Sequence, residues 1–105
     1  MKDLSSTTFN ELMDMSKEDF DTALSHDHNN IGFYTSLRKL LALQYEQMQN
    51  MVSALRLKES DPETAEEAVK LKEQALAIMM KTEYKAMKLH EKEKLLNGEI
   101  THRSV

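Results

Sequence analysis

Residues 59–62, Glu59-Ser60-Asp61-Pro62, separate two long stretches that are rich in helix-forming residues. Asp61 is a strong N-cap, and Pro62 suits the first position of a helix, where its missing N–H costs nothing. Proline also pushes the residue before it out of the helical region. Because the connection is short, we expect the two helices to lie antiparallel and in contact with each other.

The stretch before this connection has the pattern of one long helix, from near Asn30 to about Glu59. Leu, Gln and Met residues at positions 37, 41, 44, 48, 51 and 55 recur at alternating spacings of four and three. This heptad pattern keeps one face of a helix turned toward a partner helix. Gly32 makes the start of the helix less certain, because glycine lowers helix stability.

The stretch after the connection predicts a second helix, from Pro62 to Asn97, with Gly98 as the residue that ends it. Glutamates are concentrated in its first turns and lysines in its last turns. This distribution complements the helix dipole at both ends.

Residues 1–30 predict a short, acidic helical arm. Thr8 and Glu11 have the spacing of a capping box, and Ser16 offers a second helix start, so we expect one broken helix or two short ones. The polar run 25–30 reads as a loop. Three segments follow: an acidic N-terminal helical arm and loop at 1–30, an antiparallel helical hairpin at 31–97, and a flexible C-terminal tail at 98–105. The fold class is all-α, either as a three-helix arrangement or as a dimeric four-helix bundle.

Composition agrees with long helices in a single domain. The 105 residues include two glycines and one proline, too few for a fold with many turns, and eight methionines, which suit helix–helix seams. The absence of cysteine excludes disulfides and thiol chemistry. The first residues lack the apolar run of a secretory signal, and no stretch approaches the ~20 apolar residues of a membrane span. We therefore expect a cytoplasmic protein that does not enter membranes.

Chemical motifs are scarce. His26-Asp27-His28 is a cluster of possible metal ligands, but it lies in a polar loop and lacks a fourth ligand, so we interpret it as a solvated pair of histidines. No phosphate-binding loop, nucleophile elbow or His-Glu-x-x-His pattern occurs. The sequence therefore predicts no enzyme activity, no cofactor and no metal.

The charge distribution disfavours nucleic acid as a partner. The net charge is −4, and residues 1–30 contain seven acids against Lys2 and Lys17. The lysine-rich end of the second helix contains Lys81, Lys85 and Lys88, but glutamates interleave with these lysines and cancel much of their field. Nucleic-acid binding through this end stays a third hypothesis.

The leading hypothesis is a non-enzymatic protein–protein interaction module, such as an adaptor, assembly factor, chaperone or inhibitor. It buries a stripe of Leu and Met residues against a protein partner or a second copy of the chain. The second hypothesis is a structural subunit of a larger assembly, such as a phage or virus particle. The candidate interface residues are Leu37, Leu41, Met48, Met51, Met79 and Met87.

Overall fold

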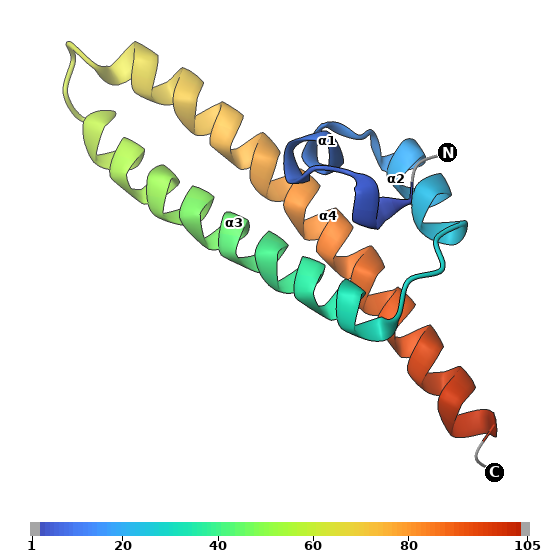
Figure 1. The fold of residues 1–105 in the computed structure, drawn as a ribbon. Coiled ribbons are helices and arrows are strands. Elements are labelled where there is room, and N and C mark those ends of the chain that lie inside the picture. The colour runs from blue at the N-terminus through green and yellow to red at the C-terminus, as the bar shows by residue number, and fades with distance from the viewer. Residues whose placement is uncertain (1–2, 104–105) are drawn as a thin grey trace.

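The computed structural model describes the backbone of residues 3–103 and the side chains of residues 3–98. In chain order the elements are the 3-10 turn η1 (Leu4–Ser6), α1 (Phe9–Asp14), α2 (Lys17–Ser25), α3 (Ile31–Lys58) and α4 (Ala65–Arg103). No strand occurs among these residues. Helices α3 and α4 run antiparallel side by side, and η1, α1 and α2 fold together on one side of them, away from the turn that joins them (Figure 1). The predicted all-α hairpin with a short helical arm is confirmed.

The first long helix has the predicted boundaries. The side chain of Asn30 accepts a hydrogen bond from the Phe33 N–H at 3.0 Å, and Glu59 is the C-cap. Gly32 lies in the first turn and does not interrupt the helix. The N-cap offsets the cost of this glycine, because it satisfies one of the free N–H groups at the helix start.

The second long helix begins three residues later than the sequence predicts, at Ala65 instead of Pro62. The Asp61 carboxylate accepts a hydrogen bond from the Glu63 N–H at 3.1 Å, and the Thr64 hydroxyl donates to the Lys58 carbonyl at 2.9 Å. These contacts hold residues 61–64 in a turn. The first α-helical hydrogen bond runs from the Ala68 N–H to the Thr64 carbonyl at 2.9 Å. Asp61 therefore caps the turn and not the helix.

The predicted end of the second helix at Asn97 is also wrong, because α4 continues through Gly98 to Arg103. Gly98 does not have the positive φ of a helix-ending glycine. A Cβ atom at this position would meet nothing within 4 Å, so no neighbouring element forces the chain to turn there. Residues 104–105 of the predicted tail lie outside the described residues, and the flexibility of this end stays a prediction.

The arm consists of two short helices with the two predicted starts. Thr8 accepts a hydrogen bond from the Glu11 N–H at 3.1 Å and forms the complete capping box, and Ser16 accepts from the Asp19 N–H at 3.1 Å. The 3-10 turn η1, with Asp3 as its N-cap, was not predicted. It forms because the Asp3 carboxylate accepts from both the N–H and the hydroxyl of Ser5.

The hydrophobic core lies where the arm meets the hairpin. Its fully buried members include Phe20 of α2, Tyr34 and Leu41 of α3, and Leu89 of α4. The arm thus covers the hairpin within its own chain, as the three-helix alternative requires. Toward the turn, burial involves only α3 and α4, through Val52, Leu55, Ala68 and Ala75.

We expect the small size of Ala75 to set how closely α3 and α4 approach in this thinner half. The substitution Ala75→Leu should lower the free energy of unfolding by about 1–3 kcal/mol, because the added atoms have no space at a position that is 2% exposed. Urea unfolding followed by circular dichroism measures the loss. The matched control is Ala77→Leu on the exposed side of α4, which should change stability by less than about 0.5 kcal/mol. Equal effects would contradict close packing at Ala75.

Candidate functional site

Two lysines of α4 fix the arm to the hairpin. The Lys85 ammonium donates to the carbonyls of Met13 and Met15, both at 2.9 Å, at the C-terminal end of α1. Lys92, two turns further along the same face, donates to the carbonyl of Leu24 at 3.1 Å, at the C-terminal end of α2. Carbonyls at a helix end have no partner in their own helix and carry partial negative charge, so a cation there is favourable.

Lys85 is nearly fully buried, which is rare for lysine. Burial is the main cause that lowers the pKa of Lys85, Lys81 lowers it further, and Asp14 acts in the opposite direction. The Phe20 ring lies 5.9 Å from the Lys85 nitrogen and adds a cation–π contact. The buried charge therefore has two carbonyl acceptors and an aromatic face around it.

A buried carboxylate joins the start of the arm to α3. Asp27 accepts hydrogen bonds from the Leu4 N–H at 3.0 Å, from the Tyr34 hydroxyl at 2.5 Å and from the Asn29 amide at 2.8 Å. Burial first, and the hydrogen bond to Asp27 second, raise the pKa of Tyr34 well above its usual value. The network thus links η1, the loop that contains Asp27 and Asn29, and α3 through one buried carboxylate.

Two further polar contacts join α4 to its neighbours, one to α2 of the arm and one to α3. The Tyr84 hydroxyl donates to the Asp21 carboxylate at 2.6 Å, and this contact raises the pKa of Tyr84 to about 12. Glu93 accepts from the Arg38 guanidinium and from the Thr35 hydroxyl, the latter at 3.0 Å. The hydrogen bond from Arg38 is the main cause that lowers the pKa of Glu93.

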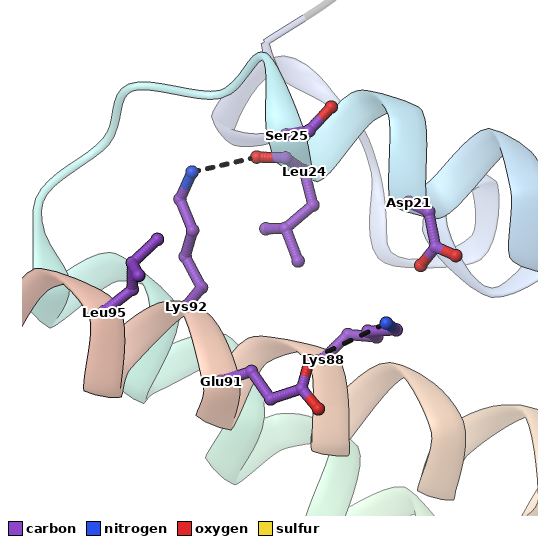
Figure 2. Close-up of a pocket in the computed structure, with 7 residues that line it drawn as sticks. All are labelled: Asp21, Leu24, Ser25, Lys88, Glu91, Lys92 and Leu95. Carbon is purple, nitrogen blue, oxygen red and sulfur yellow. Dashed lines mark hydrogen bonds and ion pairs between the residues drawn. The ribbon is translucent and has the colours of Figure 1, made fainter.

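A surface groove with a volume of about 490 Å³ lies between α2 and the C-terminal part of α4. Figure 2 shows Asp21, Leu24 and Ser25 on one wall and residues of α4 on the other, with the Lys92 ammonium directed to the Leu24 carbonyl. The α4 wall consists of Lys88, Glu91, Lys92 and Leu95. Lys88 pairs with Glu91 at 3.7 Å. Lys88 and Glu91 thus pair with each other, Lys92 contacts backbone, and Asp21 accepts from the Tyr84 hydroxyl.

Other candidate chemistry is equally sparse. His26 and His28 are exposed, whereas Asp27 between them is buried and engaged with Tyr34. Within residues 3–98 no group of three metal-ligating side chains comes together. None of the helices in the described range is both long enough and apolar enough to cross a membrane.

The structure distributes the six predicted interface residues over different environments. Leu41 is fully buried in the core beneath the arm, and Leu37, Met48 and Met79 are half-buried. Met51 and Met87 are 46% and 49% exposed. The six residues therefore do not form one accessible surface, and Met51 and Met87 are the members best placed to meet a partner.

Four exposed apolar residues of α4 share one face of the helix, and only Met87 of them was among the predicted interface residues. Val69, Leu76, Met80 and Met87 are all exposed, and Met80 is the most exposed of them at 66%. Their spacings of seven, four and seven place them on one face of the helix. We call these four residues the open stripe. The sequence contains this second heptad pattern, but the broad apolar content of the helix conceals it.

The lysine-rich end of α4 has few free cations. Lys85 and Lys92 donate to backbone carbonyls of the arm, and Lys88 pairs with Glu91. Comparison with known proteins adds no assignment: no protein-family model, curated protein or solved structure matches this chain.

We expect Lys85→Met to lower the free energy of unfolding by about 1–3 kcal/mol, because the buried carbonyls of Met13 and Met15 lose their donor. The arm should also become more sensitive to proteases than the hairpin. Lys70→Met, at an exposed lysine about four turns earlier on α4, is the matched control and should leave both properties unchanged. Wild-type stability and arm protection in the Lys85 variant would contradict the capping role.

Acid should weaken the contact between Arg38 and Glu93. Because the pKa of Glu93 is lowered in the folded chain, the folded state binds fewer protons than the unfolded state near the ordinary pKa of 4.5. The stabilisation is therefore present above that pH and is lost as the pH falls through the lowered pKa. Urea unfolding at a series of pH values between about 6 and 3 should show that the free energy of unfolding declines less for Glu93→Gln than for the wild type. Parallel declines would contradict this contribution.

Proposed function

We propose that the chain is a non-enzymatic protein–protein interaction module that binds a partner through apolar side chains which the arm leaves exposed on the hairpin. Ten large apolar side chains are more than a third exposed: Leu40, Leu43, Met51, Leu57, Val69, Leu71, Leu76, Met80, Met87 and Leu95. Single exposed apolar residues are ordinary on protein surfaces. A set that extends along both long helices is typical of an interaction surface.

The main support for this proposal is that the arm covers only one end of the hairpin. In the part next to the arm, Phe20 and Leu24 of α2 pack into the core with Leu89. Toward the turn, the buried residues come from α3 and α4 alone, and both helices keep apolar side chains such as Met51 and Leu71 at the surface. A partner that packs there would bury area that the chain itself leaves in water.

The alternatives have less support. Nucleic-acid binding requires free cations, whereas Lys85, Lys88 and Lys92 are engaged within the chain. The second hypothesis, a subunit of a particle, expects the arm to be ordered by neighbouring subunits. The arm is held by contacts within its own chain, so it adds no support to this hypothesis. An enzymatic role gains no support from the groove between α2 and α4, where Asp21 accepts from Tyr84 and the two lysines contact Glu91 or backbone. A cytoplasmic location stays a prediction.

Site-specific photo-crosslinking tests the proposal. A photoreactive residue is placed at Met51 or Met80 in the full chain, which is produced in the organism that encodes it. We expect irradiation to form adducts with a different protein in higher yield from at least one of these positions than from Asp19, an exposed position on the arm. Adducts with the chain itself only, or equal yields from all three positions, would contradict the proposal.

A further inference from the structure

We propose that the open stripe binds a basic amphipathic helix of another protein, and that a second copy of this chain does not occupy it. This inference rests on the proposed function and assigns to it one face and one kind of partner. Three observations support it: the position of the stripe on α4, a pocket beside it, and the charges that interrupt it.

The open stripe lies on the side of α4 that faces away from the arm. Met87 follows Lys85 by two residues, which corresponds to about 200° around a helix, and Lys85 is directed into the arm. Figure 1 shows the arm against one side of the hairpin only. From Val69 to Met87 the stripe extends for about 27 Å at ~1.5 Å per residue. This length offers five turns to a partner helix.

A pocket of about 270 Å³ opens between α3 and α4 beside the stripe. Leu41, Ala42 and Tyr45 form its α3 wall, and Thr82, Glu83 and Ala86 form its α4 wall. Glu83 lies between Met80 and Met87 in sequence, so the pocket and the stripe share one edge. A large apolar side chain of a docked helix could fill this pocket, as central residues of interfaces do.

Two glutamates occupy heptad positions within the stripe. Glu73 lies between Val69 and Leu76, and Glu83 lies between Met80 and Met87. Both are exposed, and neither makes an ion pair among the described side chains. Lys72, which precedes Glu73 in sequence, pairs with Glu59, the C-cap of α3. The free charge along the stripe is therefore negative, and lysine or arginine on a partner helix would complement it.

The same glutamates disfavour pairing with a second copy. The four residues of the open stripe and the two glutamates are placed symmetrically about Ile78 in sequence. If two copies pack antiparallel about a two-fold axis at this residue, Glu73 lies opposite Glu83 of the second copy. A parallel pair in register sets each glutamate against its own counterpart. A shift by one heptad in the antiparallel pair sets a carboxylate against Leu76 or Met80. Each arrangement therefore either brings two carboxylates together or removes a carboxylate from water. Charges placed in this way commonly prevent helices from pairing with a wrong partner.

Synthetic peptides test the charge preference directly. The probe is a helical peptide with leucine at the heptad positions that face the stripe and lysine at the two positions that face Glu73 and Glu83. The matched peptide has glutamate at those two positions. We expect fluorescence anisotropy to give an affinity about tenfold higher for the lysine peptide, because two attractive pairs replace two repulsive ones.

Variants of the full chain locate the binding. Met80→Glu should abolish binding of the lysine peptide, and Glu73→Gln with Glu83→Gln should remove the preference between the peptides. Gln47→Glu is the control. Gln47 is exposed and follows Leu40, which lines a pocket with arm residues, by about two turns of α3, so it lies on the arm side of the hairpin and should not affect binding. Equal affinity for both peptides, or no binding of either, would overturn the inference.

Solution mass tests the exclusion of a second copy. Analytical ultracentrifugation should find the wild type monomeric, whereas Glu73→Leu with Glu83→Leu, which completes the apolar seam, should form a dimer that Met80→Glu dissociates. A wild-type dimer that Met80→Glu dissociates would show that a second copy occupies the stripe and would overturn the inference. Photo-crosslinking to a different protein from Met51, without adducts from Met80, would overturn it as well and leave the proposed function intact.

Discussion

The whole arrangement depends on a long-range contact between lysine side chains of α4 and the helix ends of the arm. Without Lys85, the carbonyls of Met13 and Met15 at the end of α1 would lose this donor. Without Lys92, the Leu24 carbonyl at the end of α2 would keep only its hydrogen bond from the Asp27 N–H. The cost of an unpaired buried carbonyl is comparable to that of a lost hydrogen bond. The two lysines thus convert a pair of short helices, which are too short to persist alone, into one wall of the core.

The position of the arm in turn determines which apolar residues remain available. By covering Leu41 and Leu89, the arm encloses a three-layered core at one end of the hairpin. The other end remains two helices thick, so residues of equal hydrophobicity have different roles along the same helix. Leu41 is core, whereas Met51, about three turns further toward the turn, is at the surface.

Local signals in the sequence were sufficient for the fold class and for most helix starts. Asn30, Thr8 and Ser16 act as N-caps because their side chains reach N–H groups only three residues away. The start of α4 was misplaced because Asp61 caps the turn at 61–64 through its bond from the Glu63 N–H, and Thr64 holds that turn by donating to the Lys58 carbonyl. The continuation of α4 past Gly98 has no local signal, because glycine permits both outcomes.

The candidate site was less accessible to sequence reasoning. A heptad pattern identifies a face but not what covers it, so core residues such as Leu41 and exposed residues such as Met87 received the same interpretation. The role of Lys85 was also hidden, because it looked like one more lysine that complements the helix dipole. Its acceptors, the carbonyls of Met13 and Met15, lie about 70 residues earlier in the chain, beyond the range of any sequence pattern.

That separation also has a consequence for folding during synthesis. Ribosomes add about 5–20 residues per second, so the arm waits several seconds for Lys85 to be made. Until then the arm lacks the lysine donors at the ends of its two helices, which are too short to persist alone, so we expect it to become structured when α4 returns to meet it.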